Sequence, residues 1–277
     1  MKFLFPSVVV NILSFSGGGS HGAIELGILK SIYQGEQYKQ FLGVSAGSLN
    51  AAIMSSYKEP LSGIEKLNDI YTNTRNSDIY KLNFSLHTSL LDSQPLLETI
   101  KKHLPSTLFY PCSVGVTNLD SGQFEIVELN KNDNKANVLL ASSSIPVVFP
   151  PTKLGSTYYV DGGLINNQIL NNLYDGYYLN VTYITPSFSI SSWNESDINI
   201  ISLALRDFEV YRKTHTNTLL SLYKNCFKPI GEIHVYYTDE PIPYSVLEFN
   251  HGSELIKFGE KNVRHSVFNL CIVTTKN

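Results

Sequence analysis

Hydrophobic and polar residues follow two different spacings along the first 57 residues, and together they predict a strand–helix–strand–helix order. Residues Val8–Phe15 are apolar or β-branched at nearly every position, which is typical of a parallel strand buried on both faces. Apolar residues then recur at helical spacing from Ala23 to about Tyr33. A second strand is predicted at Phe41–Val44 and a second helix from Ala46 to about Ser56. This alternation indicates right-handed crossovers and a sheet covered by helices on both faces.

The remaining sequence predicts further helices and strands of the same mixed kind. Residues 59–110 are predicted to be mainly helical and are a candidate cap. The other predicted elements are a hairpin of Ser113–Thr117 with Phe124–Val127, helices near Leu96–Leu104, Ala136–Ser144, Ile201–Lys213 and Glu254–His265, and strands near Tyr158–Val160, Tyr178–Ile184 and Ile233–Tyr237. No linker or repeat interrupts them, so we expect one domain over residues 1–277. The predicted fold is a three-layer α/β/α arrangement with a mainly parallel central sheet.

Composition excludes several classes of protein. Hydrophobic residues make up 43% of the chain, so it can bury a core and is not disordered. A net charge of −3 argues against a nucleic-acid-binding protein and against a polybasic membrane anchor. No apolar stretch approaches the roughly 18 residues that cross a bilayer. Residues 1–5 resemble the start of a signal peptide, but Pro6, Ser7 and Asn11 interrupt the apolar run, so we expect a cytoplasmic protein, peripheral at membranes if it meets them.

The three cysteines, Cys112, Cys226 and Cys271, lie far apart and form no C-x-x-C pair. This spacing fits neither a disulfide framework nor a zinc site. We therefore expect buried free thiols in a reducing compartment. The chain also shows no calcium-loop pattern, and we expect no metal and no cofactor.

The sequence Gly43-Val44-Ser45-Ala46-Gly47 lies between a predicted strand and a predicted helix. A serine on such a sharp strand-to-helix turn is exposed as a nucleophile, and small neighbours allow strand and helix to pack closely. The helix N-terminus also stabilises negative charge that develops nearby. The alternative is a chance G-x-S-x-G in a turn of small residues.

A glycine-rich loop, Gly17-Gly18-Gly19-Ser20-His21-Gly22, follows the first strand. A dinucleotide site would place an acidic residue at the end of the next strand, but that strand ends in Val44-Ser45. A P-loop would end in Gly-Lys-Ser/Thr, which is missing. The loop is then either an oxyanion hole, with glycine N–H groups directed at a tetrahedral intermediate, or a structural turn. Neighbouring parallel strands would bring it to the same sheet edge as Ser45, which favours the oxyanion hole.

Asp161-Gly162-Gly163 follows the strand predicted at Tyr158–Val160. Asp-Gly is common in ordinary turns. Beside a nucleophilic serine, however, Asp161 is a candidate general base. To accept a serine proton directly, its carboxylate must be partly desolvated and within hydrogen-bond distance of the hydroxyl.

Taken together, these three motifs resemble those of the patatin-like phospholipase family, and the resemblance extends from about residue 8 to residue 167. Two weaker features are also similar: Pro95-Leu96 at the start of a helix, and Ala141-Ser142-Ser143-Ser144-Ile145-Pro146 before the aspartate. The resemblance implies a patatin-like fold and calcium-independent hydrolysis of lipid acyl esters by a Ser–Asp dyad. It assigns Ser45 as nucleophile and Asp161 as proton acceptor. It further assigns the oxyanion hole to Gly17, Gly18 and Gly19, and the remaining motif positions to Gly22, Gly43, Gly47, Gly162 and Gly163.

Two positions depart from the family pattern. The family usually has Arg or Lys where this chain has His21, so a permanent positive charge beside the glycine loop is missing. The family also often has Asn-Pro shortly after its aspartate, where this chain has Asn166-Asn167-Gln168. We interpret the second departure as a loop variant.

Three other functions are consistent with the same residues. A Ser–His–Asp triad would pair Asp161 or Asp207 with a later histidine, and the candidates are His215, His234, His251 and His265. An acyltransferase would pass the acyl group from the serine to another acceptor. A non-catalytic lipid-binding module would use the fold without the chemistry.

A phospholipid or another acyl lipid is the expected substrate, with transient apolar contact to a membrane surface and no binding of nucleic acid. The residues expected to line an acyl groove or contact the lipid interface form two apolar sets. The sets are Ile145, Val147, Val148, Phe149, Pro150 and Pro151, and Tyr71, Ile79, Tyr80, Phe84, Leu90 and Leu91.

Overall fold

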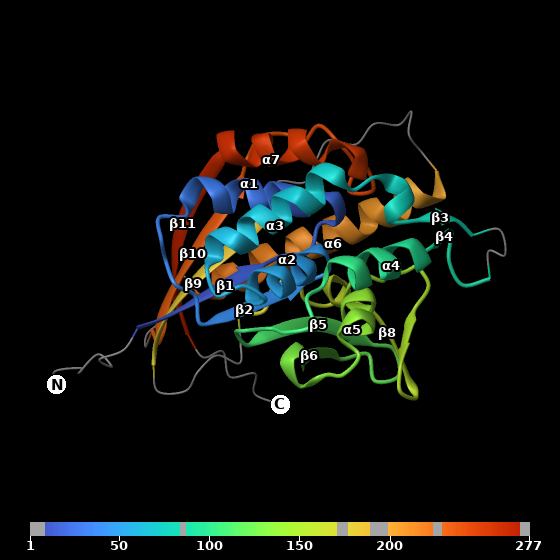
Figure 1. Cartoon of the computed structure of the whole chain (residues 1–277), viewed down its shortest axis with the longest axis horizontal. Helices are drawn as coiled ribbons and strands as arrows, with labels where there is room; N and C mark the ends of the chain where they lie inside the picture. Colours follow the sequence, from blue (N-terminus) through green and yellow to red (C-terminus); the bar gives the residue numbers. More distant parts are fainter. Residues whose placement is uncertain (1–8, 84–86, 171–176, 189–198, 224–228, 272–277) are drawn as a thin grey trace.

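A mixed, mostly parallel sheet forms the centre of the molecule (Figure 1). The computed structural model describes residues 9–83, 87–170, 177–188, 199–223 and 229–271. Within these residues the strand order is β11-β10-β9-β1-β2-β5-β8-β7, and β6 pairs with β5. The strands are β1 (Val9–Phe15), β2 (Gln40–Val44), β5 (Cys112–Asn118), β6 (Phe124–Glu128), β7 (Thr152–Leu154), β8 (Thr157–Asp161), β9 (Tyr178–Ser187), β10 (Gly231–Thr238) and β11 (Val263–Leu270).

The parallel strands lie together in the middle of the sheet. β1 pairs in parallel with β2 and with β9, β2 pairs in parallel with β5, and β10 pairs in parallel with β9. The antiparallel strands β11, β6, β8 and β7 lie toward the two ends. This arrangement explains the apolar sequence of β1, because a parallel strand with neighbours on both edges and helices on both faces has little contact with water.

Helices cover both faces of this sheet. Leu13 and Phe15 of β1 point into one hydrophobic cluster, which takes side chains from α1 (Gly22–Ile32), α2 (Ala46–Ser55), α3 (Pro60–Asn73), α4 (Gln94–His103), α5 (Lys135–Ser142) and α7 (Gly252–Lys261). Val10 and Ile12 point into a second cluster on the other face, where Leu220 and Tyr223 of α6 (Ile200–Tyr223) pack. The α/β/α layering predicted from the sequence is therefore confirmed.

Most of the predicted elements are present, with shifts of a few residues at their ends, except that the helix predicted near Ile201–Lys213 continues to Tyr223 in α6. The helix predicted over 254–265 is wrong in its last part: α7 ends at Lys261, and residues 263–270 form β11, which pairs along the edge of β10. In segment 59–110 the structure adds a short hairpin, β3 (Lys81–Leu82) with β4 (Leu91–Asp92), to α3 and α4. Cys112 is a buried free thiol as predicted, whereas Cys271 is disulfide-bonded, so the prediction of free thiols is wrong for that residue. Cys226 lies outside the described residues.

Strands β2 and β8 end against each other along one edge of β5. Val44, the last residue of β2, pairs with Gly115, and Asp161, the last residue of β8, pairs with Val116. β6 occupies the opposite edge of β5 over residues 113–117, so β2 and β8 share the remaining edge. Because β2 runs parallel and β8 antiparallel to β5, their carboxyl ends meet, and the residues that follow them are brought together.

Candidate active site

Ser45 lies at the turn between β2 and α2 in a backbone conformation that side chains rarely adopt, with φ 54° and ψ −129°. The two glycines of the motif permit this turn. A Cβ on Gly43 would lie 2.2 Å from the carbonyl oxygen of Gly47, and a Cβ on Gly47 would lie 2.2 Å from the carbonyl oxygen of Ser16. The strand and helix therefore pack backbone to backbone beneath the serine, as the sequence pattern predicts.

Hydrogen bonds fix the backbone of Ser45 on both sides. Its N–H donates to Oγ of Ser142 (2.8 Å), and that hydroxyl donates in turn to the carbonyl oxygen of Gly115 (2.7 Å). Its carbonyl oxygen accepts from Oγ of Ser48 (2.6 Å). Ser142, the last residue of α5, thus supports the strained turn directly, a role that the resemblance to the family motif did not specify.

Asp161 is fully buried at the end of β8. Burial raises the pKa of its carboxyl from 3.8 to about 6, although the Ser45 hydroxyl, the Gly163 N–H and the positive charge of Arg212 each lower it. The Gly163 N–H donates to Oδ1 (2.8 Å), whereas Oδ2 has no hydrogen-bond partner among the described residues. Asp161 therefore has one anchored oxygen and one oxygen available to accept a proton.

The Ser45 hydroxyl is close enough to the Asp161 carboxylate to lower its pKa, but no hydrogen bond of ordinary length and angle joins them within the described part of the chain. Catalytic hydrogen bonds are often long or poorly aligned before substrate binds. Gly162 allows this approach: a Cβ at that position would lie 2.4 Å from the carbonyl oxygen of Gly115.

The glycine loop passes beside Ser45, and each of its first three glycines is crowded by other atoms. A Cβ on Gly17 would lie 2.8 Å from Cβ of Ser45. Gly19 has φ 57°, and a Cβ there would lie 2.2 Å from the carbonyl oxygen of Val246. A side chain is thus excluded at Gly17 by lack of space, and at Gly19 both by lack of space and by the backbone angle.

The N–H groups of this loop are not equivalent. The Gly17 N–H donates to Oδ1 of Asn167 (3.0 Å), so it is already occupied. The N–H groups of Gly18 and Gly19 donate to no acceptor in the described residues. Of the three donors predicted from the sequence, Gly18 and Gly19 are therefore free to bind a developing negative charge, while Gly17 is held by Asn167.

His21 does not provide a positive charge at neutral pH. It is buried, and Nε2 lies 2.7 Å from the carbonyl oxygen of Tyr244, so that nitrogen carries the proton and donates. Burial lowers the pKa of His21 to about 4. A cation instead reaches the loop from α6, where the buried Arg212 donates from Nη1 to the carbonyl oxygen of Gly17.

A buried acid, Glu25 of α1, supports the start of the same loop. Its Oε1 accepts from the N–H (3.0 Å) and the hydroxyl (2.9 Å) of Ser16. Its Oε2 accepts from Nδ2 of Asn50 (3.0 Å), and Oδ1 of Asn50 accepts from the Tyr71 hydroxyl (2.8 Å). Burial raises the pKa of Glu25 well above its usual range. This network connects the glycine loop to α2 and α3.

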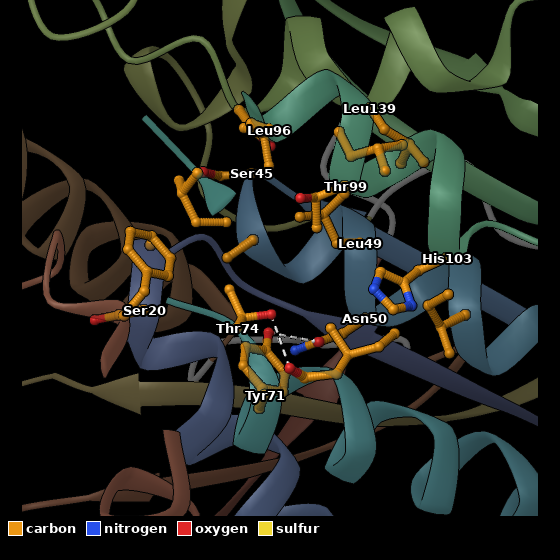
Figure 2. Close-up of a pocket in the computed structure, with 18 of the residues that line it drawn as sticks. Ser20, Ser45, Leu49, Asn50, Tyr71, Thr74, Leu96, Thr99, His103 and Leu139 are labelled. Carbon is orange, nitrogen blue, oxygen red and sulfur yellow. Dashed lines mark hydrogen bonds between the residues drawn. The ribbon is translucent and has the colours of Figure 1, made fainter. Parts of the chain in front are cut away.

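An apolar cavity of about 100 Å³ opens beside Ser45 (Figure 2). Its wall comes mainly from α2, α3 and α4, through residues such as Leu49, Ile53, Leu67, Ile70, Leu96 and Ile100. In Figure 2, Ser45 and Leu96 lie on one side of the cavity, and Tyr71 and Thr74 lie on the other. Segment 59–110, predicted as a cap, thus supplies much of the cavity wall.

Only some of the residues predicted to line a groove do so, and the half-buried Tyr80, Leu90, Pro150 and Pro151 are not part of the cavity wall. Tyr71, Ile79, Ile145 and Phe149 line the cavity. Leu91 and Val148 are buried in the core, while Val147 is exposed, with φ 70°. Phe84 lies outside the described residues.

The later histidines contact other groups. His234 and His265 stack on each other across β10 and β11, His251 stacks on Tyr244, and His215 stacks on Tyr211. None of the four forms a hydrogen bond with Ser45 or Asp161 in the parts of the chain that the structure describes. Asp207, the alternative acid, is exposed on α6.

Sequence reasoning did not identify Arg212 or Glu25 as parts of this site, and it gave Ser142 as part of a motif without a role. Glu25 carried a signal, because it is a lone acid among the apolar residues that begin α1. Arg212 carried none, because its helix is long and rich in polar residues, and its contact with Gly17 joins residues far apart in the sequence.

No group of three or more His, Cys, Asp or Glu side chains in the described residues is arranged to hold a metal ion. Among the same residues, no helix has both the length and the apolar character needed to span a bilayer.

The chain is similar in sequence to known proteins. The chain is 26% identical over 165 residues to an NTE family protein, MT2641, of Mycobacterium tuberculosis (strain CDC 1551 / Oshkosh); the match covers 57% of this chain and 27% of that protein. The chain thus spans about a quarter of the length of this relative.

Among solved structures, VipD of Legionella pneumophila is 13% identical, with TM-score 0.42 over 93% of this chain and 68% of that one. The ExoU–SpcU complex of the Pseudomonas aeruginosa type III secretion system matches at 12% identity and TM-score 0.31, over 95% of this chain and 54% of that one. Residues 13–173, more than half of the chain, match the family described as patatin-like phospholipase. The chain therefore belongs to the patatin-like phospholipase family.

Proposed function

We propose that this protein hydrolyses carboxylic esters of acyl lipids, as a calcium-independent phospholipase A-type enzyme with an acyl-serine intermediate. The observation that carries the proposal is the meeting of β2 and β8, which brings the Ser45 hydroxyl beside a buried carboxylate at the edge of an apolar cavity. A nucleophile, a base and an apolar site for an acyl chain are the parts that ester hydrolysis of a lipid requires.

In the proposed first half-reaction, Oδ2 of Asp161 accepts the Ser45 proton while Oγ attacks the ester carbonyl. Gly163 holds Oδ1, so Oδ2 is the oxygen with capacity for a proton. The negative charge that forms on the carbonyl oxygen is stabilised by the N–H groups of Gly18 and Gly19 and by the N-terminus of α2. When the tetrahedral intermediate breaks down, the leaving alcohol or lysophospholipid takes the proton from Asp161.

In the second half-reaction, water replaces the alcohol. Asp161 accepts a proton from water, the resulting hydroxide equivalent attacks the acyl-serine, and the fatty acid leaves as Ser45 recovers its proton. The pKa of about 6 suits this role: the carboxylate is ionised at neutral pH, yet it is a stronger base than an exposed aspartate.

The cavity supports an acyl chain as the group that is bound. It contains side chains from α2, α3 and α4 and lies directly beside Ala46 and Ser45. An extended chain would bury apolar surface there, at about 25 cal/mol for each Å² removed from water. We infer that the ester carbonyl lies at Ser45, with its acyl chain in the cavity and its headgroup outside. With no excess of basic residues, contact with the membrane would be apolar and transient.

The test is product analysis. Purified wild-type protein and Ser45→Ala are incubated with vesicles of a defined phosphatidylcholine in excess calcium chelator, and the products are identified by mass. We expect free fatty acid and lysophospholipid from the wild-type protein and neither from the variant. The assay is repeated with an added alcohol. Transfer of the acyl group to that alcohol, with little free fatty acid formed, would identify an acyltransferase. Failure of a fluorophosphonate to label Ser45 would instead identify a non-catalytic module.

A further inference from the structure

Arg212 contacts the glycine loop at one particular peptide. Its Nη1 donates to the carbonyl oxygen of Gly17, and its side chain is buried. That carbonyl belongs to the same peptide unit as the Gly18 N–H. Because a trans peptide is planar, its C=O and N–H point in opposite directions, so fixing one fixes the other.

We propose that Arg212 is a positioning residue of the oxyanion hole, which holds and polarises the Gly17–Gly18 peptide so that the Gly18 N–H is directed at the reacting carbonyl. This inference rests on the proposed function. A hydrogen bond to the carbonyl oxygen of an amide also strengthens its N–H as a donor, since hydrogen-bonded groups polarise one another. Arg212 acts through Gly18 and does not touch the substrate.

A second contact supports this arrangement. Oδ1 of Asn167 accepts from the Gly17 N–H (3.0 Å), while Nδ2 of the same side chain lies 3.5 Å from the Gly17 carbonyl oxygen. Gly17 is therefore held at both its N–H and its carbonyl. Consecutive glycines have wide conformational freedom, so a loop of this composition requires such external contacts to keep one orientation.

The charged groups around Arg212 explain how a buried cation is tolerated there. Asp161 on β8, Glu209 on α6, Tyr183 on β9 and Glu25 on α1 all favour its charged form, whereas burial lowers its pKa. A guanidinium remains charged in such surroundings. Of the other basic groups nearby, Lys213 forms an ion pair with Glu209 (2.7 Å), and His21 is neutral at pH 7.

The same charge acts on the base. The positive charge of Arg212 lowers the pKa of Asp161, so the residue that orients the oxyanion donor also affects the pH at which the carboxylate ionises. A residue needed only for packing would affect stability without changing either the oxyanion hole or this pH. The two effects together distinguish a positioning role from a merely structural one.

The experiment compares Arg212→Met and Arg212→Lys with wild-type enzyme, with Arg206→Met as the matched control. Arg206 lies on the same helix as Arg212 and, like Lys213, forms an ion pair with Glu209 (3.3 Å). Steady-state kcat and KM are measured from pH 5 to 9 with a soluble acyl ester, and folding is checked by thermal denaturation.

We expect Arg212→Met to lower kcat by about 10- to 100-fold, less than outright removal of an oxyanion donor, with KM changed by less than about threefold. The acidic limb of its profile of kcat against pH should move to higher pH, because the positive charge that lowers the pKa of Asp161 is lost. Arg212→Lys should keep the wild-type limb, because the charge remains, but lose part of kcat, because the guanidinium geometry is lost. Arg206→Met should match the wild-type enzyme.

A folded Arg212→Met enzyme with wild-type kcat, or a loss confined to KM, would overturn the inference. If Arg212→Met does not fold, Arg212→Lys decides: an unchanged kcat would overturn the inference, and a lower kcat with an unchanged acidic limb would support it. Failure of the proposed function has a different signature, namely that wild-type protein shows no Ser45-dependent hydrolysis at all.

Discussion

Ser45 and Asp161 are neighbours because β2 and β8 end against each other on the same edge of β5, with Val44 opposite Gly115 and Asp161 opposite Val116. One strand thus sets the spacing between the proposed nucleophile and the proposed base. The end of α5 and the turn after it hold both residues. The hydroxyl of Ser142, the last residue of α5, accepts from the Ser45 N–H, and the carbonyl oxygen of Ser144 in the turn accepts from the Asp161 N–H (2.9 Å).

Replacing Asp161 by Asn should abolish hydrolysis and stabilise the fold. The pKa is raised in the folded state, so the native protein binds more protons than the unfolded chain between about pH 4 and 6, and its stability falls as pH rises through that window. Above about pH 6, the ionised Asp161 carboxylate lowers the free energy of unfolding by about 3 kcal/mol. The neutral amide of the variant would avoid this loss. Denaturant unfolding at pH 8 and pH 4 checks this: Asp161→Asn should be more stable than wild-type at pH 8 only.

The control for activity is Asp207→Asn, on the surface of α6, which should hydrolyse esters as the wild-type protein does. A loss of activity in Asp207→Asn would favour a Ser–His–Asp triad that uses Asp207.

The wild-type enzyme should lose activity in acid with a midpoint near pH 6. Asp161 must be ionised to accept the Ser45 proton, and its pKa is about 6, so the active fraction falls as the pH drops below that value. The profile of kcat/KM against pH for a soluble ester measures this limb directly. A midpoint near pH 4 would show that the Asp161 carboxylate is solvated in the free enzyme.

Two inactive variants of Ser45 should differ in stability. Both Ser45→Ala and Ser45→Gly lack the nucleophile, but only glycine adopts φ 54° without strain. We therefore expect Ser45→Gly to be more stable than Ser45→Ala by about 1 kcal/mol. Denaturant unfolding of the two proteins gives the difference, and equal stabilities would mean that the turn relaxes once the hydroxyl is removed.

Replacing Gly43 by Ala should destabilise the protein far more than the same change at Gly122. The new methyl at position 43 would lie 2.2 Å from the carbonyl oxygen of Gly47, a backbone atom that cannot move without separating β2 from α2. Gly122 has a positive φ, which Gly43 does not have, but nothing lies within 4 Å of a Cβ there, so its substitution costs about 1 kcal/mol. Expression and thermal unfolding compare the two. Similar losses would contradict the close packing beneath Ser45.

Filling the cavity should change the preference for chain length. Leu49 lies on α2 one turn after Ser45 and lines the cavity, so Leu49→Trp would occupy the space of an acyl chain. We expect about a tenfold or greater loss of kcat/KM on long-chain esters, with short-chain esters cleaved nearly normally, since about 1.4 kcal/mol of lost apolar contact suffices. Leu61→Trp, exposed on α3 outside the cavity, is the matched control. Equal losses for short and long esters would place the acyl chain elsewhere.

Local patterns in the sequence predicted the strand–turn–helix units correctly. The apolar run of β1, the small residues around Ser45 and the Asp-Gly-Gly turn each have local causes, namely burial, steric access and backbone freedom. The end of α7 was missed because apolar residues of β11 also suit a helix, and pairing with β10 determined the outcome.

The sequence by itself thus determined the motifs, their order and the turn that presents Ser45, because these depend on neighbours along the chain. Only the tertiary structure decided which glycine N–H groups are free and which cation reaches the loop. Asn167 occupies the Gly17 N–H from 150 residues away, and Arg212 reaches the Gly17 carbonyl from 195 residues away. Such contacts arise from the packing of whole elements, and no short-range pattern encodes them.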